Sequence, residues 1–406
     1  MTRHLHVVDS ARPDEVFVAL REALAGGAAV VPRDLSSPAA AVSRWPADDA
    51  RVAQNVALVI ETSGSTGSPK RVALSADALL ASAAASAGAM GGQGQWLLTL
   101  PAHYVAGAQV LVRSLAAETE PVRYGEGHFD PSRFAEAAEQ LTHDLRYVSL
   151  VPVQLARLVD AVEAGERRVA DAVRRFDGIL VGGQALTPEL RKRARDAGAR
   201  ILTTYGSSET AGGCVYDGVP IGSTLVRSVD GLLEIAGPVL AEGYIGDAAR
   251  TARAFHEADG HRWYRTGDLG SVQNGVVTVS GRADNVIISG GEKVLLDAVE
   301  RVIRGIPGLE HAVVVGVEDA EWGQVPVVVA ERSASIELAA VRARASGELG
   351  RAAAPARIVQ VDVLPHLSSG KPDRVAAAGL AEAAVPSGDA GHAGHVGNAG
   401  HAGEGA

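Results

Sequence analysis

Short apolar runs alternate with helical patterns along the first half of this chain, and that alternation constrains its fold more than any other feature. Strand-like runs are expected at residues 96–100, 147–151, 178–182 and 200–204. Helical patterns fall among these runs, at residues 106–117, 131–141, 152–163 and 187–197. Strands and helices that alternate in this way are typical of a layered, largely parallel core. The sequence therefore predicts the α/β fold class.

Further elements are expected on either side of this core. Toward the N-terminus they are a helix at residues 11–26, a strand at 28–31 that Pro32 stops, a strand at 56–60 and a helix at 75–90. After about residue 220, short runs separated by Gly and Asp indicate β-hairpins at residues 232–236, 262–266 and 275–280. A small α+β unit follows, with strands at residues 285–288, 311–317, 325–331 and 357–361 and helices at 296–304 and 335–349.

The last residues, from about Pro386 on, are rich in Gly, Ala and His and offer almost no core-forming side chains. We expect this tail to be disordered. A metal site at His392, His395 and His401 is the alternative interpretation of its histidines.

Composition and charge narrow the classes of partner. The chain has 406 residues, 47% of them hydrophobic and 21% charged, which is a globular composition long enough for two or more domains. A formal net charge of −10 argues against nucleic acid and anionic membranes as partners, because both attract basic surfaces. The single Cys214 excludes an internal disulfide and a cysteine-based zinc site. Because the N-terminus has no apolar signal segment and no run is long enough to insert into a membrane, we expect a cytoplasmic protein.

A loop rich in glycine and hydroxyl side chains follows the apolar run at residues 56–60. Its positions are Thr62, Ser63, Gly64, Ser65, Thr66 and Gly67, and Lys70 closes it. Glycines let the backbone approach a polyphosphate, while N–H groups, hydroxyls and the lysine charge can bind its oxygens. The loop differs from the common nucleotide-binding loop, because Ser68 and Pro69 separate the last glycine from the lysine. The alternative is a solvated Ser/Gly turn.

Two further motifs contain residues suited to a nucleotide. Tyr205, directly after the run 200–204, can stack on a purine, and Glu209 after it can hold Mg²⁺. Ser208 offers a hydroxyl to an α-phosphate. Asp268 lies in a tight turn, which is a usual way to hold ribose hydroxyls. Each motif alone is also consistent with an ordinary turn.

Three more segments complete the pattern. Gly183 and Gln184 stand at a glycine-rich strand end, where the glycines either clear room for a flat base or simply make a turn. Another motif runs from Gly281 to Asn285 and is followed by a polar segment at residues 289–293. Lys371 lies on a loop near the chain end, where an isolated lysine would be a solvated surface charge.

Taken together, the motifs resemble in order and spacing the adenylate-forming superfamily of acyl-CoA synthetases, peptide-synthetase adenylation domains and luciferases. The resemblance extends from about residue 50 to residue 380. It implies a large layered N-terminal domain at residues 1–281, a hinge at 282–284 and a small mobile α+β domain at 285–385, followed by the tail at 386–406. It also implies that an acid attacks ATP to give acyl-AMP and pyrophosphate, and that CoA then takes the acyl group.

The same resemblance assigns roles to the candidate residues. The nucleotide would be bound by the loop from Thr62 to Lys70 at its β- and γ-phosphates, by Gly183, Gln184 and Tyr205 around the adenine, and by Asp268 and Arg282 at the ribose.

Catalysis and the change between half-reactions would depend on a second set of residues. Glu209 would coordinate Mg²⁺, and Ser208 stands where the family usually has threonine. Lys371 would reach the reacting groups from the small domain, which would turn about Asp284. Gly291 would lie where the pantetheine arm of CoA passes.

A narrower resemblance points to the acid. The segment before the phosphate loop is short for the superfamily, and residues 100–114 and 216–222 are similar to the o-succinylbenzoate–CoA ligases of actinobacterial menaquinone synthesis. The acid of such ligases has a second carboxylate, which needs a cation or several donors.

Four side chains are the candidates for binding this acid. Arg113 is expected to hold the second carboxylate, with Ser207 and Thr210 as further donors, and Tyr104 is expected beside the acid. An intrachain or surface ion pair is the alternative role of Arg113.

Other functions stay open at this point. The chain is also consistent with another acyl- or aryl-CoA ligase, or with an enzyme that loads a carrier protein, although no carrier domain follows. A regulatory protein that has lost catalysis is disfavoured, because Lys70, Glu209, Asp268 and Lys371 are all present. A homo-oligomer is left open.

Overall fold

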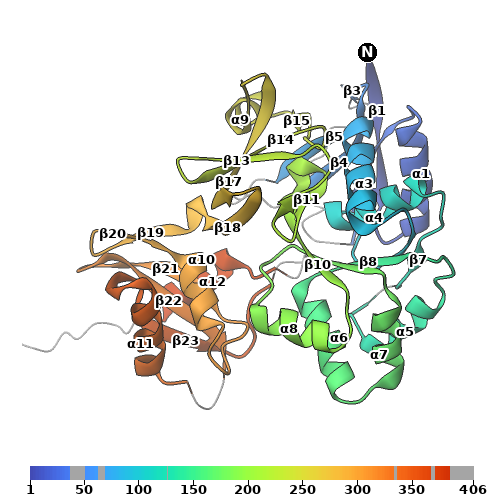
Figure 1. The fold of residues 1–406 in the computed structure, drawn as a ribbon. Helices are drawn as coiled ribbons and strands as arrows, with labels where there is room; N and C mark the ends of the chain where they lie inside the picture. The colour runs from blue at the N-terminus through green and yellow to red at the C-terminus, as the bar shows by residue number, and fades with distance from the viewer. Residues whose placement is uncertain (37–50, 63–68, 126, 333–335, 367–370, 385–406) are drawn as a thin grey trace, which may run out of the picture. The chain divides into compact units, whose positions relative to one another are not determined.

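The computed structural model describes residues 1–36, 51–62, 69–125, 127–332, 336–366 and 371–384 (Figure 1). Contacts within the chain define two units. The first comprises Met1–Val286 together with His366–Lys371, and the second comprises Ile287–Pro365 together with the chain from Pro372 onward. The domain boundaries and the hinge expected from the sequence stay predictions. The expected disordered tail and its histidines lie outside the described residues.

One sheet of the first unit has six strands in the order β15-β5-β4-β2-β1-β3. Its strands are β1 (Thr2–Asp9), β2 (Ala29–Arg33), β3 (Arg51–Ala53), β4 (Val56–Thr62), β5 (Lys70–Ser75) and β15 (Gly243–Tyr244). β4 and β5 are antiparallel neighbours in which Thr62 pairs with Lys70. The two ends of the expected phosphate loop are therefore side by side, while residues 63–68 lie outside the described residues.

A second sheet of seven strands, in the order β12-β11-β10-β9-β8-β6-β7, contains the parallel core. Its strands are β6 (Gln95–Leu98), β7 (Val122–Arg123), β8 (Arg146–Leu150), β9 (Gly178–Val181), β10 (Ile201–Ser207), β11 (Gly212–Tyr216) and β12 (Val219–Pro220). The strands from β10 to β7 in this order are mutually parallel, which confirms the α/β prediction. Their carboxyl ends meet at one edge, where the connecting loops can form a ligand site.

Helices cover both faces of the second sheet (Figure 1). Leu98 and Leu180 join a buried cluster with α1 (Pro13–Leu24), α3 (Ala76–Met90), α4 (Val105–Ala116) and strands of the first sheet. Leu97 and Ile179 face the other way, toward α5 (Pro131–Glu139), α6 (Pro152–Glu163), α7 (Arg167–Arg175) and α8 (Pro188–Asp196). Because neighbouring residues of a strand point to opposite faces, the apolar strands bury both sides. One helical layer thus lies between the two sheets.

A third sheet of the first unit is antiparallel. It contains β13 (Leu225–Val229), β14 (Leu232–Ala236), β16 (Phe255–Ala258), β17 (His261–Gln273) and β18 (Val276–Arg282), and α9 (Ala248–Ala254) precedes β16. The hairpins expected at residues 232–236, 262–266 and 275–280 are confirmed within it. The β17–β18 pair places Asp268 opposite Arg282. Two motifs of the sequence therefore meet on neighbouring strands.

The second unit is the expected α+β unit. Its sheet has the order β20-β19-β22-β21, with β23 paired to β22, and its strands are β19 (Val286–Ser289), β20 (Glu292–Leu295), β21 (Val313–Asp319), β22 (Gly323–Glu331) and β23 (Arg357–Val361). α10 (Leu296–Ile303) and α11 (Leu338–Leu349) pack on one face of this sheet, and α12 (Arg374–Ala383) packs on the other. Across the described residues of the chain, no helix is long and apolar enough to cross a membrane.

The structure corrects one expected strand end. Pro32 does not stop β2, which continues to Arg33. Proline cannot donate to a ladder, but β2 pairs with β4 only at Val30, so the missing N–H of Pro32 removes no bond on that side. On its other side β2 pairs with β1 along five residues, Pro32 included.

Candidate active site

The strand end of β10 forms the centre of the candidate site. After Ser207 the chain makes the short 3-10 turn η1 (Ser208–Thr210) and returns as β11. The Ser207 N–H donates to Thr210 Oγ1 at 2.8 Å, and the Thr210 hydroxyl donates to the carbonyl of Gly212 at 2.8 Å. Thr210 is fully buried. Its hydroxyl stabilises the turn, and the expected role of Thr210 as a donor to the acid stays a prediction.

Glu209 is buried at this turn and is positioned by a tyrosine that the sequence did not single out. The Tyr244 hydroxyl donates to Glu209 Oε1 at 2.8 Å, and only 6% of Glu209 is exposed. Burial and the neighbouring carboxylate raise the pKa of the Tyr244 phenol, so it stays protonated and keeps donating. Lys70 Nζ lies 6.0 Å from the centre of the Tyr244 ring, which links the phosphate-loop lysine to the same place.

A magnesium ion with ATP fits these residues. No group of three or more His, Cys, Asp or Glu side chains that could hold a metal alone is found within the described ranges. Mg²⁺ in ATP sites usually needs only one or two carboxylates, because phosphates and water complete its octahedron. Glu209 supplies one such carboxylate. The Tyr244 hydroxyl donates to its Oε1, and the other carboxylate oxygen takes no part in that bond.

The expected adenine and ribose residues come together from three strands. The Tyr205 hydroxyl donates to Asp268 Oδ2 at 2.6 Å, and Arg282 Nη1 donates to Asp268 Oδ1 at 3.2 Å. Arg282 also holds Asp284 through two bonds, from Nε to Oδ1 at 3.1 Å and from Nη2 to Oδ2 at 3.0 Å. The structure therefore assembles Tyr205, Asp268 and Arg282, which lie far apart in the sequence.

The electrostatics of this group follow from burial and pairing. Burial raises the pKa of the Asp268 carboxyl, although the bonds from Tyr205 and Arg282 oppose the shift. The hydrogen bond from Arg282 lowers the pKa of the Asp284 carboxyl. The turn before Asp268 uses Gly267 at φ +74°, a conformation that glycine adopts without strain. Asp268 is thus fixed by its own turn and by two neighbours.

Gly183 and Gln184 follow β9, next to the strand that ends at Tyr205. Gly183 has φ +83°, and a Cβ atom built on it would lie 3.8 Å from Cε of Lys371. Desolvation lowers the pKa of the Lys371 ammonium, and Asp268 acts in the opposite direction. By its contacts, Lys371 belongs to the first unit. It therefore lies in the same unit as the residues that are expected to bind the nucleotide.

Tyr104 stands at the N-cap of α4, after the end of β6. Its ring centre is 4.1 Å from that of His103, whose Nδ1 is 2.8 Å from Ser10 Oγ at the end of β1. Burial lowers the pKa of the His103 imidazole, while Asp34 opposes the shift. Nothing in the sequence pattern signalled the contact with Ser10, because it joins segments of different sheets.

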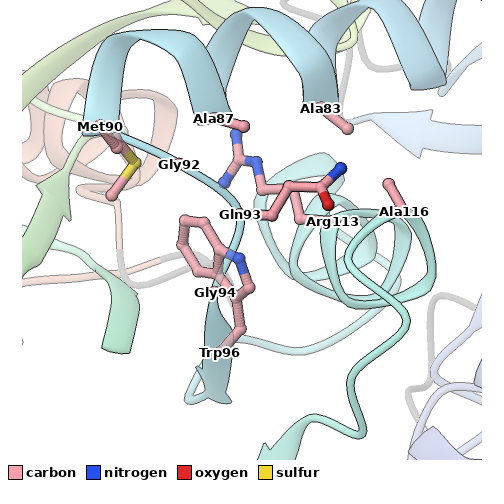
Figure 2. A pocket seen from close by; sticks show the side chains of 9 residues that line it. All are labelled: Ala83, Ala87, Met90, Gly92, Gln93, Gly94, Trp96, Arg113 and Ala116. Atoms are coloured by element: carbon pink, nitrogen blue, oxygen red, sulfur yellow. The ribbon is translucent and has the colours of Figure 1, made fainter. Parts of the chain in front are cut away.

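Arg113 does not lie with these residues. Figure 2 shows it in a small pocket with Trp96 and, from α3, Ala87 and Met90. Its guanidinium carbon is 4.8 Å from the Trp96 ring centre, and Nη2 donates to the Tyr216 hydroxyl at 3.4 Å. Only 6% of Arg113 is exposed. These contacts indicate a side chain built into the core.

The strand register places Trp96 of this pocket toward the opposite edge of the sheet from Tyr205, whereas Tyr216, which Arg113 contacts, pairs with Thr204. Trp96 pairs with Tyr147, and Tyr147 pairs with Gly178, which is level with the start of β10. Tyr205 is four residues beyond Ile201, or about 13 Å along the strand at about 3.3 Å per residue. The expectation that Arg113 binds the second carboxylate stays a prediction.

The remaining expected residues are placed as follows. Asp284 lies in the 3-10 turn η2 (Ala283–Asn285), where the bond from Arg282 holds it. Gly291 belongs to the second unit, has φ +84° and has open space on its Cβ side. Among the phosphate-loop positions only Thr62 and Lys70 are described; Ser63, Gly64, Ser65, Thr66 and Gly67 lie outside the described residues.

Tyr244 and Tyr264 are the residues that sequence reasoning missed. Burial is the larger cause that raises the pKa of the Tyr264 phenol, and the Glu209 carboxylate is the second. The same two causes raise the pKa of the Tyr244 phenol. Aromatic residues make up only 4% of the chain, so each one near a motif is informative. The Gly243-Tyr244 pair sits in β15 beside β5, whose first residue is Lys70. That strand pairing, which local sequence does not reveal, brings Tyr244 to Glu209.

The fold and the site define a nucleotide-using α/β enzyme with a second, smaller α+β unit. Comparison with known families places the chain more closely. Residues 4–245 match the model described as AMP-binding enzyme, and residues 298–371 match that of the AMP-binding enzyme C-terminal domain. The chain belongs to the AMP-binding enzyme family, which confirms the resemblance to adenylate-forming enzymes.

Individual relatives agree with this family. The chain is 38% identical over 334 residues to a probable 2-succinylbenzoate–CoA ligase of Mycobacterium tuberculosis, covering 80% of this chain and 85% of that protein. A solved structure of Escherichia coli MenE with bound OSB-AMS is 26% identical, with a TM-score of 0.73 and coverage of 94% and 88%. The o-succinylbenzoate CoA synthetase MenE of Bacillus subtilis, in complex with OSB-AMP, shares the fold at 22% identity and a TM-score of 0.73, with coverage of 92% and 87%.

Proposed function

We propose that this protein activates 2-succinylbenzoate with ATP and transfers the acyl group to CoA, a step of menaquinone biosynthesis. The observation that carries the proposal is the 38% identity to a probable 2-succinylbenzoate–CoA ligase along 85% of that protein's length. The site supports the reaction type, because residues suited to a base, a ribose and a metal-bound phosphate converge on one strand edge. We take the reaction to be cytoplasmic, with neither nucleic acid nor a membrane as a partner.

The reaction has two half-reactions. In the first, a carboxylate oxygen of the acid bonds to the α-phosphorus of ATP, the bond from that phosphorus to the bridging oxygen breaks, and pyrophosphate leaves. In the second, the sulfur of CoA bonds to the acyl carbon, the acyl–phosphate bond breaks, AMP leaves, and the thiol proton passes to solvent. Anions meet in the first step, so positive charge and hydrogen-bond donors must stabilise the transition state.

The chain's own residues divide this work. Tyr205 stacks on the adenine, Gly183 and Gln184 line the same pocket, and Asp268 with Arg282 binds the ribose hydroxyls. Support for these assignments is the 2.6 Å bond from Tyr205 to Asp268, which fixes the ring and the carboxylate with respect to each other. A preorganised pair loses little entropy when the nucleotide arrives.

A second group acts on the phosphates. The loop from Thr62 to Lys70 holds the β- and γ-phosphates, and Ser208 donates to the α-phosphate. Glu209 holds Mg²⁺, which when bound neutralises charge on the phosphate oxygens. Tyr244 keeps the Glu209 carboxylate in one orientation, and the 2.8 Å bond between them supports this role.

In our proposal, rotation of the small domain switches the site from the first half-reaction to the second. Lys371 donates to the reacting phosphate during adenylation, and its neighbourhood with Gly183 supports that position. Rotation about Asp284 then removes Lys371 and brings Gly291 to the pantetheine arm. Ser207 and Tyr104 contact the acid, and a single site thus serves two reactions in turn.

The proposal is tested by product analysis. Purified protein is mixed with ATP, Mg²⁺ and CoA, and 2-succinylbenzoate, benzoate, a fatty acid and other aryl acids are offered one at a time. Mass spectrometry is expected to find a CoA thioester of 2-succinylbenzoate together with AMP. A thioester formed only from another acid would keep the reaction type and exclude the proposed substrate.

A further inference from the structure

Glu61 lies near the end of β4, between two arginines on the neighbouring strands. Its Oε2 is 3.4 Å from Nε of Arg33 in β2, and its Oε1 is 3.7 Å from Nε of Arg71 in β5. We call these three residues the Glu61 row. Their side chains are only 11% (Arg33), 19% (Glu61) and 22% (Arg71) exposed. Water and salt therefore screen these ion pairs less than they screen pairs on an open surface.

The strand register explains why these three charges meet. Glu61 pairs with Arg71 across the antiparallel β4–β5 pair. Val30 pairs with Leu58 across the parallel β2–β4 pair, and three residues further along both strands Arg33 comes level with Glu61. Residues that are level on neighbouring strands share a face of the sheet. The Glu61 row therefore crosses three strands on one face.

The Glu61 row adjoins both ends of the expected phosphate loop. Thr62 follows Glu61, Lys70 precedes Arg71, and Thr62 pairs with Lys70. Because successive residues of a strand point to opposite faces, the side chains of Thr62 and Lys70 lie on the other face of the sheet from the row. The row can therefore act on these two residues through the backbone that it holds in place.

Arg71 extends this link to the carboxylate that we propose for magnesium. Its carbonyl accepts a hydrogen bond from the Ile245 N–H at 2.9 Å. Ile245 directly follows Tyr244, whose hydroxyl donates to Glu209 at 2.8 Å. Lys70 Nζ in turn lies 6.0 Å from the centre of the Tyr244 ring. The position of the start of β5 therefore influences both Lys70 and Tyr244.

We propose that Glu61 is a positioning residue that sets Thr62 and Lys70 for the β- and γ-phosphates of ATP. This rests on the proposed function, in which these two residues bind those phosphates. Without the charge of Glu61, Arg33 and Arg71 would stand two strand spacings apart, about 10 Å, on either side of a neutral group. Like charges in a partly buried place repel each other. The strand ends would then no longer hold Lys70 in one position.

The test compares ATP, which carries the β- and γ-phosphates, with AMP, which lacks them. Glu61→Gln keeps the size of the side chain and removes its charge. We expect the KM for ATP in acid-dependent pyrophosphate release to rise about 10-fold, as for loss of one contact to a charged group. The Kd for AMP, measured by calorimetry, should stay close to the wild-type value, because AMP has no phosphate for Lys70 to bind.

Two further variants of the Glu61 row make the result decisive. Glu61→Asp keeps the charge and should retain most of the wild-type affinity for ATP. Arg33→Gln leaves Glu61 paired with Arg71 alone, so it should raise the KM for ATP by a smaller factor than Glu61→Gln. Arg33 lies on a strand that does not enter the loop, and its variant decides the test if Glu61→Gln does not fold.

Glu234→Gln is the matched control. Glu234 is also level with two arginines on neighbouring strands, with Arg227 at 2.8 Å and Arg265 at 3.4 Å. It belongs to the third sheet, whereas Thr62 and Lys70 belong to the first. Glu234→Gln should lower the Tm as Glu61→Gln does, but it should leave the ratio of the KM for ATP to the Kd for AMP unchanged.

Three outcomes are distinct. A raised ratio in the variants that weaken the Glu61 row, without a rise in Glu234→Gln, supports the inference. An unchanged ratio in active Glu61→Gln and Arg33→Gln, or an equal rise in Glu234→Gln, overturns it while leaving the proposed function intact. A wild-type enzyme that releases no pyrophosphate with 2-succinylbenzoate contradicts the proposed function, and the role of Glu61 falls with it.

Discussion

A single hydrogen bond from Tyr244 orients Glu209, the carboxylate that we propose as the magnesium ligand. Both side chains are buried, with 8% and 6% exposed, so water competes little for the bond between them. The raised pKa of the Tyr244 phenol keeps the donor protonated across the physiological range. The carboxylate therefore enters the reaction already oriented, which is the advantage of a preorganised site.

Removing the Tyr244 hydroxyl should reduce magnesium-dependent activity more than it reduces the stability of the fold. In Tyr244→Phe we expect kcat/KM for ATP to fall about 10-fold or more, since a hydrogen bond to a charged group contributes about 1.5–3 kcal/mol. Binding of Mn²⁺–ATP in place of Mg²⁺–ATP, followed by electron paramagnetic resonance, should weaken in parallel.

Tyr216→Phe is the matched control for this variant. Tyr216 is also buried, but its hydroxyl bonds Ser86 at 2.7 Å, away from Glu209. The two variants should lose similar stability, and only Tyr244→Phe should change the magnesium dependence. Equal magnesium dependence in the Tyr244→Phe and Tyr216→Phe variants would show that Tyr244 contributes packing alone.

Cys214 illustrates a residue near the site that has no chemical task. It is buried among apolar side chains, and burial raises the pKa of its thiol to about 12. A thiol that stays protonated is a poor nucleophile. This agrees with its interpretation from the sequence as a small buried residue.

At the scale of elements, the β10–β11 hairpin brings the chemistry together. Its turn needs two residues in the left-handed region, Ala211 at φ +50° and Gly212 at φ +96°. The Thr210 hydroxyl closes the turn through the carbonyl of Gly212. Glu209 belongs to this turn, so our proposal connects the backbone conformation of the turn with metal binding.

A methyl group at Gly212 should separate the stability of this turn from its function. Gly212→Ala is expected to lower the free energy of unfolding by about 1–3 kcal/mol because of the positive φ. It should also lower kcat/KM for 2-succinylbenzoate, because Gly212 pairs with Ser207, which we propose contacts the acid.

Gly91→Ala is the control for Gly212→Ala, since Gly91 ends α3 at φ +89° with nothing within 4 Å of an added Cβ. Denaturant unfolding should give comparable losses for both variants, while kinetics should change only for Gly212→Ala. Normal kinetics in Gly212→Ala would contradict the closeness of this turn to the acid.

Local pattern was sufficient for most elements of the fold. The alternation of apolar runs predicted strands β6, β8, β9 and β10 and the helices among them. The patterns of these strands and helices can be recognised from neighbouring residues alone. It missed β1, whose burial alternates irregularly, and α7, which is short and follows α6 closely. Such elements depend on partners far away in the sequence.

The candidate site was predictable to a different extent. Tyr205, Asp268 and Arg282 could be named because each lies in a motif of fixed local form, and the structure brings them together. Tyr244 and Ser10 could not be named, since their significance comes from a strand pairing and a contact between sheets. The role of Arg113 stays a prediction, because residue type alone does not report which groups surround a side chain.

At the scale of the whole molecule, the two half-reactions make different demands on the same chain. In our proposal, adenylation needs Lys371 near the phosphates, whereas thioester formation needs access for a thiol. The proposed rotation about Asp284 would meet both needs in turn, because it carries one set of groups away and brings in another.

Replacing Lys371 should therefore affect one half-reaction only. Lys371→Ala is expected to lower acid-dependent pyrophosphate release by about 100-fold or more, as is typical when a group that stabilises the transition state is removed. The same variant should form the CoA thioester from supplied acyl-AMP at close to the wild-type rate. Lys192→Ala, at an exposed lysine of α8 that pairs with Asp196, is the control and should leave both rates unchanged. A similar loss in both half-reactions of Lys371→Ala would contradict the exchange of two conformations.

The central claim is that this chain makes the adenylate of 2-succinylbenzoate, and isotope exchange tests it most directly. Labelled pyrophosphate is incubated with the protein, ATP and Mg²⁺, without CoA, and the label that appears in ATP is measured with and without the acid. Our account predicts exchange that requires 2-succinylbenzoate and is much slower with benzoate or a fatty acid. Exchange that is equally fast without any acid, or absent with 2-succinylbenzoate but present with another acid, would contradict it.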